Sequence, residues 1–208
     1  MFVELIESLR CPRDHEESPL VVAASRTEAR HVMEGSLGCP VCRAEFPIHA
    51  GEALFGGVAA AEARAGNAET GMRLAAFLDL TDRRGFAILS GPWGAHAEEM
   101  RQIATTPLLL VNPPRGVDVS ATGILRVRGR LPVAALSARG AALDESADEV
   151  LLASTVAAVR AGGRLVGPVS LAIPEGVREL TRDTQMWVGE KNAASDDPTR
   201  RLVALRRA

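Results

Sequence analysis

The chain has 208 residues, a formal net charge of −2 and a sequence pI near 6.1. This near-neutral charge argues against a general binder of nucleic acid or of anionic membranes, and an aromatic content of 3% with no tyrosine argues against stacking on single-stranded nucleic acid. Hydrophobic residues at 47% and charged residues at 24% are typical of a globular protein, and the length suits one ordinary domain with a small appendage.

Two features bear on the cellular compartment. No window is apolar for long enough to cross a bilayer, and the first ten residues, which contain Glu4 and Glu7, do not form the pattern of a signal peptide. The three cysteines are an odd number, and two of them are separated by only two residues. This count argues against a disulfide framework and favours metal-bound thiolates in a reducing compartment. We therefore expect a cytoplasmic protein without a membrane segment.

The composition divides the chain into three regions. Residues 1–52 are rich in Cys, His, Pro and charge, and they indicate short strands and turns. Residues 53–70 are rich in alanine and are expected to form a connector with some helix. Residues 71–208 alternate between the periodicities of helices and strands.

The first region contains a metal-binding pattern. Cys11-Pro-Arg-Asp-His15 is followed, after 23 residues, by Cys39-Pro-Val-Cys42. Two ligands so close in sequence can reach one ion from a tight turn, and the spacer is long enough for a two-stranded return that brings the two turns together. The pattern predicts a zinc site built by Cys11, His15, Cys39 and Cys42.

The fourth ligand is the open point of this site. The more usual ribbon has a second cysteine at position 14, where this chain has Asp14, so that Asp14 or His31 is an alternative to His15. A solvated role is the simpler interpretation of His31. Four protein ligands leave no open position for water or substrate, and a region of ~50 residues buries little core, so we expect the metal to be structural.

In the third region, a helix is predicted for the segment that follows Gly71 and ends near Arg84. Short apolar runs then predict buried strands over residues 85–90, 107–112, 123–128 and, more weakly, 140–144. A polar helix is expected between the first two of these strands, with Ala97, Met100, Ile103 and Ala104 on one side.

The remainder adds one helix and three strands. Ser146 and Glu149 form a capping-box pattern, and Gly162 is a stop signal, so a helix is predicted over residues 146–161. A strand over residues 164–169 follows. The runs 184–189 and 201–206 are predicted to form an antiparallel closing pair. Strands that alternate with helices imply a mostly parallel sheet.

Residues 9–51 resemble the small zinc-ribbon proteins that activate tRNA and protein methyltransferases. The matching sequences are Leu9-Arg-Cys-Pro, Gly38-Cys-Pro-Val-Cys42 and Phe46-Pro-Ile-His-Ala-Gly51. The Cys-Pro-x-x-His form of the first turn is also similar to the ribbon of an rRNA guanine methyltransferase. The resemblance implies bound zinc and a protein partner, with a methyltransferase as one candidate.

The region from Gly71 to the C-terminus resembles the class I, seven-stranded methyltransferases that use S-adenosylmethionine. The best-matching sequence is Val156-Ala-Ala-Val-Arg-Ala-Gly-Gly-Arg-Leu-Val166, and the two closing strands also fit. The resemblance places the cofactor beside Gly91, Trp93, Gly94 and Asn112.

Those positions depart from the family's pattern. The loop Ser90-Gly-Pro-Trp-Gly94 keeps two glycines, but Pro92 removes an N–H and Trp93 is bulky. Asn112 stands where the family has the acidic residue that binds the ribose hydroxyls, and an amide lacks the paired acceptors of a carboxylate. The sequence Asn112-Pro-Pro114 looks like a motif of amino-group methyltransferases, but that motif belongs after a later strand and we assign it to chance.

Two charged groups complete the candidates. Asp144, Glu145, Asp148 and Glu149 either line a cleft or, as we prefer, complement the dipole of the helix that follows. The alternating Arg126, Arg128 and Arg130 either bind phosphate or, as we prefer, cover a solvated strand face.

The sequence thus predicts a Rossmann-like, methyltransferase-type α/β fold with a mostly parallel sheet and an N-terminal zinc ribbon. The leading functional hypothesis is a pseudoenzyme that has lost its cofactor and acts as a partner or regulatory subunit. The first alternative is an active S-adenosylmethionine-dependent methyltransferase with an unusual cofactor loop. The second alternative is an RNA-binding ribbon, which the charge disfavours. The sequence leaves the oligomeric state and the substrate open.

Overall fold

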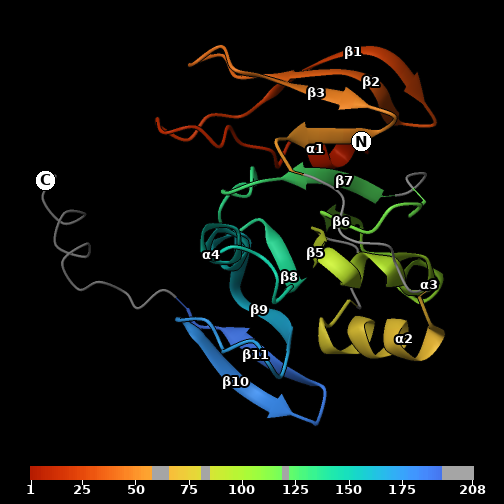
Figure 1. Cartoon of the computed structure of the whole chain (residues 1–208), viewed down its shortest axis with the longest axis vertical. Helices are drawn as coiled ribbons and strands as arrows, with labels where there is room; N and C mark the ends of the chain where they lie inside the picture. Colours follow the sequence, from red (N-terminus) through yellow and green to blue (C-terminus); the bar gives the residue numbers. More distant parts are fainter. Residues whose placement is uncertain (58–65, 81–84, 119–121, 194–208) are drawn as a thin grey trace, which may run out of the picture.

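The computed structural model describes residues 1–57, 66–80, 85–118 and 122–193 (Figure 1). The helices in these ranges are α1 (Val3–Ile6), α2 (Ala68–Phe77), the 3-10 helix η1 (Gly91–His96), α3 (Ala97–Ile103) and α4 (Glu149–Ala158). The strands are β1 (Val21–Glu28), β2 (His31–Gly38), β3 (Glu45–His49), β4 (Glu52–Phe55), β5 (Ala87–Ser90), β6 (Leu108–Val111), β7 (Thr122–Val127), β8 (Ala138–Ala142), β9 (Val159–Pro168), β10 (Val177–Arg182) and β11 (Met186–Lys191).

The strands of the described ranges form one 11-stranded sheet in the order β1-β2-β3-β4-β7-β6-β5-β8-β9-β11-β10. The first four strands pair antiparallel, and so do β9, β11 and β10. All pairs from β4 to β9 are parallel. The predicted α/β class is therefore confirmed, with a parallel core. The sheet as a whole is mixed rather than mostly parallel, because antiparallel strands flank that core on both sides.

Both faces of the central strands are buried, as the continuous apolar runs of a parallel sheet require. On β5, Ile88 points into one hydrophobic cluster, while Ala87 and Leu89 point into the other. The first cluster includes side chains of α1 and α4, and the second includes side chains of α2 and α3. In Figure 1, α2 and α3 lie together on one side of the strands and α4 lies on the other. The result is three layers.

Most predicted elements are present, with shifted ends. The apolar runs 85–90, 107–112, 123–128, 140–144, 164–169 and 184–189 correspond to β5, β6, β7, β8, β9 and β11. The predicted strand 201–206 lies outside the described residues. In the described chain, β11 lies between β9 and β10, and its closing antiparallel partner is β10, whose largely exposed and charged sequence gave no apolar signal.

The predicted start and end of the helix at residues 146–161 were wrong. The N-cap is Asp148, whose carboxylate accepts a hydrogen bond of 2.8 Å from the backbone N–H of Leu151, while Ser146 bonds to Asp144 instead. The helix ends at Ala158, and Val159 has extended dihedral angles and begins β9. Gly162, with φ 71°, therefore lies inside β9, in the stretch where the register of that strand against β8 shifts.

The ribbon region joins the α/β region edge to edge. Strand β4 pairs in parallel with β7, from Glu52 opposite Ile124 to Phe55 opposite Val127. The Arg126 guanidinium forms two hydrogen bonds of 2.7 Å to the Glu52 carboxylate. The prediction of a solvated strand face was wrong for Arg126, which is only 5% exposed, because β4 covers β7. The division of the chain at residue 52 stays a prediction, since one sheet runs across it.

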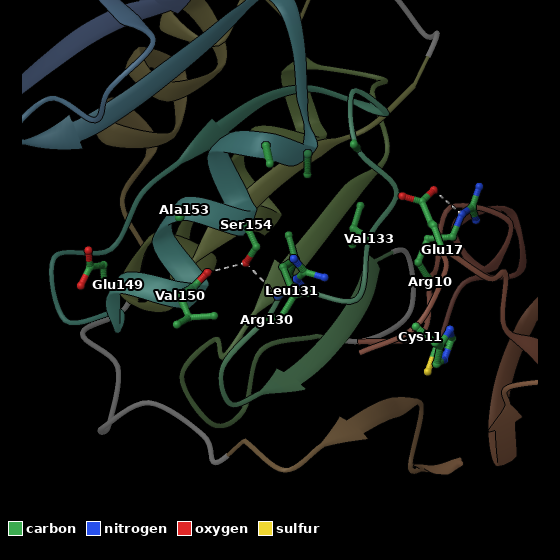
Figure 2. Close-up of a pocket in the computed structure, with 14 residues that line it drawn as sticks. Arg10, Cys11, Glu17, Arg130, Leu131, Val133, Glu149, Val150, Ala153 and Ser154 are labelled. Atoms are coloured by element: carbon green, nitrogen blue, oxygen red, sulfur yellow. Dashed lines mark hydrogen bonds and ion pairs between the residues drawn. The ribbon is translucent and has the colours of Figure 1, made fainter. Parts of the chain in front are cut away.

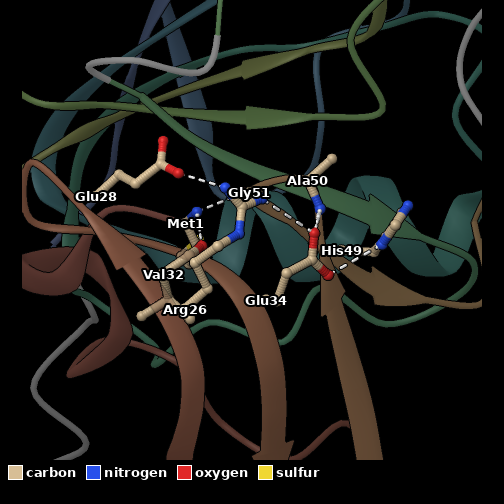
Figure 3. A network of polar contacts seen from close by, with 8 residues as sticks. All are labelled: Met1, Arg26, Glu28, Val32, Glu34, His49, Ala50 and Gly51. Carbon is tan, nitrogen blue, oxygen red and sulfur yellow. Dashed lines mark hydrogen bonds and ion pairs between the residues drawn. The ribbon is translucent and has the colours of Figure 1, made fainter.

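A second polar network holds the ribbon together (Figure 3). The main-chain nitrogen of Met1 donates hydrogen bonds to the carbonyl oxygens of Val32 and Gly51. The Glu34 carboxylate accepts from the backbone N–H of Ala50 at 3.1 Å and lies 3.0 Å from the ring of His49. Backbone and imidazole donors together lower the pKa of Glu34. These contacts fix the turn between β3 and β4 against β2.

No helix in the described part of the chain is both long and apolar enough to cross a membrane. The alanine-rich connector predicted at residues 53–70 is described in part. Its beginning belongs to β4 and its end to α2, whose N-cap Asn67 accepts a hydrogen bond from Thr70. Residues 58–65 lie outside the described ranges.

Candidate metal centre and cleft

The structure brings together the four residues that the sequence singled out as metal ligands. One ligand atom from each of Cys11, His15, Cys39 and Cys42 lies within 4.8 Å of every other. The Sγ atoms of Cys11 and Cys42 are 3.7 Å apart, and Cys39 Sγ is 3.4 Å from Nε2 of His15. The two halves of the cluster come from different loops, one after α1 and one between β2 and β3.

Backbone hydrogen bonds shape both loops. In the first loop, Cys11 N donates to Ser18 O at 3.0 Å, which closes a turn that carries His15. In the second loop, Arg43 N donates to Cys39 O and Cys39 N donates to Ala44 O, both at 2.9 Å. Arg43 adopts a left-handed conformation with φ 59°, which lets the tight turn close. These turns thus direct the side chains of Cys11 and His15 and those of Cys39 and Cys42 toward the same point.

This donor set fits zinc. Tetrahedral bonds of about 2.0–2.3 Å would set the ligand atoms roughly 3.5–3.8 Å apart. The S–S separation of 3.7 Å lies in that range and the S–N separation of 3.4 Å lies just below it. Cys11 and Cys39 are buried, whereas Cys42 is exposed. Three thiols and one imidazole form a complete set of four ligands, so the cluster could hold a structural zinc ion.

The structure places His15, and neither Asp14 nor His31, in the cluster among the described residues. Nδ1 of His15 lies 2.6 Å from the carbonyl oxygen of Glu16, so Nδ1–H donates there and Nε2 faces the thiols. The expectation that His31 is solvated was wrong. Its ring is 4% exposed and lies against Phe2, with Nδ1 3.2 Å from Ala29 O.

The environment moves two of the thiol pKa values in opposite directions. Burial raises the pKa of Cys11 to about 11, although the backbone N–H of Arg13 opposes the shift. Burial also disfavours the Cys39 thiolate, but hydrogen bonds from the backbone N–H groups of Cys42 and Val41 outweigh it and lower the pKa of Cys39 to about 6. A thiolate at Cys39 is the form that binds a metal.

A second candidate site lies at the carboxyl ends of the parallel strands. There, a cavity of about 360 Å³ is lined by residues at the ends of four strands: Ser90 and Gly91 at the end of β5, Asn112 after β6, Arg128 after β7 and Asp144 after β8. The chain reverses direction across the sheet between β5 and β8, and open α/β sheets bind ligands at such a switch point. The sequence had pointed to the glycine and the asparagine, and it had offered Asp144 as a cleft residue and Arg128 as a phosphate binder only as alternatives.

The four residues predicted to contact S-adenosylmethionine separate into two pairs. Gly91 and Asn112 line the cavity, whereas Trp93 and Gly94 are not among its lining residues. The indole N–H of Trp93 donates to the carbonyl oxygen of Leu143 at 2.8 Å, and the ring packs on the cluster beneath α2 and α3. Gly94 lies so close to Pro113 that a Cβ there would be 2.7 Å from the proline Cβ. Both residues therefore pack the structure rather than face the cavity.

The side chain of Asn112 is engaged by the backbone. Its Nδ2 donates to Val127 O at 2.9 Å, and its Oδ1 accepts from Val127 N at 2.8 Å. The residue is left-handed, with φ 51°, a conformation that asparagine tolerates better than most residues. The amide thus extends the hydrogen bonding between β6 and β7.

Gly91 is held against an acidic side chain. A Cβ at Gly91 would lie 2.1 Å from Oδ2 of Asp144, and the backbone has φ 57°. The Asp144 carboxylate also accepts from the backbone N–H and the hydroxyl of Ser146. Both interpretations of the acidic cluster at residues 144–149 are confirmed in part. Asp148 caps α4, and both Asp144 and Asp148 line the cavity.

A larger cavity of about 610 Å³ lies between the Cys/His cluster and α4 (Figure 2). Cys11 and His15 form part of one wall, together with Arg10, which pairs with Glu17 at 3.1 Å. Val150, Ala153 and Ala157 of α4 form the opposite wall. The sequence pointed only to the Cys/His wall of this cavity and gave no pattern that indicated the wall formed by α4.

Comparisons with known proteins bear on the ribbon. Residues 3–51 match the family model described as Trm112p-like protein. Among solved structures, a Corynebacterium glutamicum protein of known crystal structure is similar at 17% identity and a TM-score of 0.44, over 64% of this chain and 85% of that one. No curated protein matches the chain. The N-terminal region is thus Trm112p-like, of the kind that partners methyltransferases.

Proposed function

We propose that this chain is a methyltransferase-type α/β domain that carries its own Trm112p-like zinc ribbon and acts as a non-catalytic partner protein. The family match supports a zinc-binding region of the kind that binds methyltransferases. The parallel pairing of β4 with β7 supports a ribbon whose first partner lies in the same polypeptide. Zinc held by the Cys/His cluster would add folding stability to the ribbon, because it would join the two loops that carry the ligands.

The arrangement of β5 to β11 supports the methyltransferase type. These seven strands have a parallel core in the order β7-β6-β5-β8-β9, which is the doubly wound pattern, followed by the antiparallel β11 and β10. The sequence resemblance is to a seven-stranded family with such a closing pair.

The observation that carries the non-catalytic proposal is the amide of Asn112. In the resembled family, an acidic residue in this place binds the ribose hydroxyls of the cofactor. Here both polar atoms of the side chain bond to the backbone of Val127. The amide therefore serves the sheet and offers no paired carboxylate acceptor to a ribose. Asp144 fills the space beside Gly91, where a close approach of cofactor would be needed.

A protein partner is expected to bind away from β4. Both edges of that strand are occupied within the chain, one by β3 and the other by β7. A methyltransferase or another protein would therefore contact a different surface of the molecule. The exposed Val41 beside the Cys/His cluster is 60% exposed and lies on one such surface.

The second candidate is an active methyltransferase that uses S-adenosylmethionine. The cavity of about 360 Å³ at the switch point favours it, because Trp93 does not fill that space and both Gly91 and Asn112 line it. On this proposal, the side chains of Arg128 and Asp144 would make some of the contacts to the cofactor that the family's acidic residue makes.

Calorimetric titration of zinc-assayed protein with S-adenosylmethionine separates the two candidates. The non-catalytic proposal predicts no heat of binding at millimolar ligand. Binding in the micromolar range would overturn it in favour of the enzyme. An Arg128→Ala variant is the control, since Arg128 is exposed and lines the cavity, so its loss would weaken any genuine binding there.

A further inference from the structure

The Cys/His cluster is open to solvent on two sides, which a purely structural zinc site does not require. Cys42 is exposed, and Cys11 and His15 line the cavity of about 610 Å³ beside α4. A small oxidant can therefore reach Cys42 without unfolding the ribbon, whereas Cys11 and Cys39 are buried. Zinc-bound cysteines in a sealed site lack such access.

The sulfur atoms of Cys11 and Cys42 lie close enough together for oxidation to join them in a disulfide bond. Cys11 Sγ lies 3.7 Å from Cys42 Sγ, and a disulfide bond is about 2.05 Å long. The two residues belong to different loops, so a small movement of either loop brings the sulfurs into bonding distance. Their connection would also link the first loop to the turn between β2 and β3.

We propose that Cys11 and Cys42 form a reversible, peroxide-responsive disulfide that expels zinc from the ribbon. This inference rests on the zinc site of the proposed function. Hydrogen peroxide oxidises the Cys42 thiolate to a sulfenic acid and is itself reduced to hydroxide. The Cys11 thiolate then attacks the Cys42 sulfur, the S–S bond forms, and the sulfenic oxygen leaves as a second hydroxide. The two sulfurs lose two electrons in total, and the zinc ion leaves with its oxidation state unchanged.

The loss of two sulfur ligands has a defined structural consequence. Zinc would keep only Cys39 and His15, which is too few for a stable tetrahedral site. The new bond would preserve the link between the two loops while the metal departs. Treatment with a dithiol reductant and zinc restores the starting state, because a disulfide is reversible where sulfinic and sulfonic acids are not.

The test treats the full chain, with its zinc content assayed beforehand, with hydrogen peroxide. Zinc release is followed with a chromogenic chelator, and the cysteines are located by peptide mass mapping. The proposal predicts the release of one zinc ion per chain together with a Cys11–Cys42 peptide that is two hydrogen atoms lighter than the two free peptides. A bridge that contains Cys39, zinc release with only over-oxidised cysteines, or no release at millimolar peroxide would each overturn it. Absence of zinc before treatment would instead contradict the metal site.

Two matched variants sharpen the test, because histidine at either position keeps a four-ligand set. Cys42→His removes one sulfur of the proposed pair, and its zinc is expected to resist peroxide. Cys39→His leaves the pair intact and is expected to lose zinc and form the Cys11–Cys42 bridge as the wild type does. Equal peroxide sensitivity of the two variants would contradict the proposal. If either variant fails to bind zinc, the wild-type peptide map still decides.

Discussion

At the scale of single residues, Asn112 has a structural role at a position where the resembled family has a cofactor-binding carboxylate. Its amide bonds to both the N–H and the carbonyl of Val127, in a left-handed backbone conformation. We predict that Asn112→Asp destabilises the protein by about 1–3 kcal/mol, since a carboxylate cannot donate to the carbonyl oxygen of Val127. The free energy of unfolding from denaturant titration measures this change.

The same variant bears on the cofactor question. Asn112→Asp supplies the carboxylate that the resembled family uses, but the account predicts that it gains no affinity for S-adenosylmethionine. Asn112→Gly is the control, because it keeps the left-handed backbone and removes both side-chain bonds. A variant with an unchanged unfolding midpoint would show that the amide does not serve the sheet.

The ion pair between Glu52 and Arg126 is the second residue-scale feature. The Arg126 side chain is 6% exposed and that of Glu52 is 27% exposed, so the pair joins β4 to β7 largely out of solvent. Glu52→Ala is expected to cost about 3 kcal/mol, because it leaves a buried guanidinium without its carboxylate. The double variant Glu52→Leu with Arg126→Met is expected to recover most of that loss. If chemical denaturation finds the single variant as stable as the wild type, the pair does not hold the ribbon to the sheet.

At the scale of elements, α4 depends on a lysine from a distant strand. Lys191 of β11 donates from Nζ to the carbonyl oxygens of Val156, Ala157 and Val159, where the helix ends. Burial lowers the pKa of Lys191. Since a cation at a helix C-terminus satisfies free carbonyls and the helix dipole, Lys191→Met should destabilise the fold by about 1–3 kcal/mol.

Thermal unfolding followed by circular dichroism checks this prediction. Arg160→Met, at an exposed position of β9, is the matched control and should leave the melting temperature nearly unchanged. Equal effects of the two substitutions would show that a lost charge, rather than the lost cap, explains any change.

The turn between β10 and β11 makes stability depend on pH. The Asp183 carboxylate accepts from the backbone N–H groups of Gln185 and Met186 and pairs with Arg73 of α2, and these contacts lower its pKa. A carboxyl group with a lowered pKa in the folded state stabilises the fold above its unfolded pKa of about 3.9, and the contribution is lost as the pH falls through the folded value. The wild type should therefore exceed Asp183→Asn in stability at neutral pH.

Denaturant titrations at a series of pH values measure the gap between these two proteins. The gap should be constant from pH 7 down to about 5 and should close in more acidic solution. A gap that widens on acidification would have the wrong sign for a lowered pKa.

At the scale of the whole molecule, the sequence predicted best where one physical signal dominates. Apolar runs such as 107–112 located buried strands, and the Cys/His spacing located the cluster that the structure assembles. The ion pair of Arg126 could not be predicted from a local pattern, since its partner Glu52 is 74 residues away in the sequence. Likewise, the engagement of Asn112 by Val127 depends on the pairing of two strands, which periodicity alone does not specify.

The predicted start of α4 was wrong because a second capping residue lies close by in the sequence. Ser146 and Glu149 matched a capping box, but Asp148 is also a good N-cap residue and accepts from the backbone N–H of Leu151, while Ser146 bonds to Asp144. Strand β10 was not predicted at all, because an edge strand with exposed charged residues has no apolar pattern. The ribbon's position against its own α/β region became visible only with the pairing of β4 and β7.

The claim on which the rest depends is that Cys11, His15, Cys39 and Cys42 hold one zinc ion. X-ray absorption at the zinc edge, on protein purified without added metal, tests it most directly. The account predicts one zinc per chain with three sulfur neighbours at about 2.3 Å and one nitrogen at about 2.0 Å. Protein without zinc, or zinc surrounded only by oxygen and nitrogen, would contradict it.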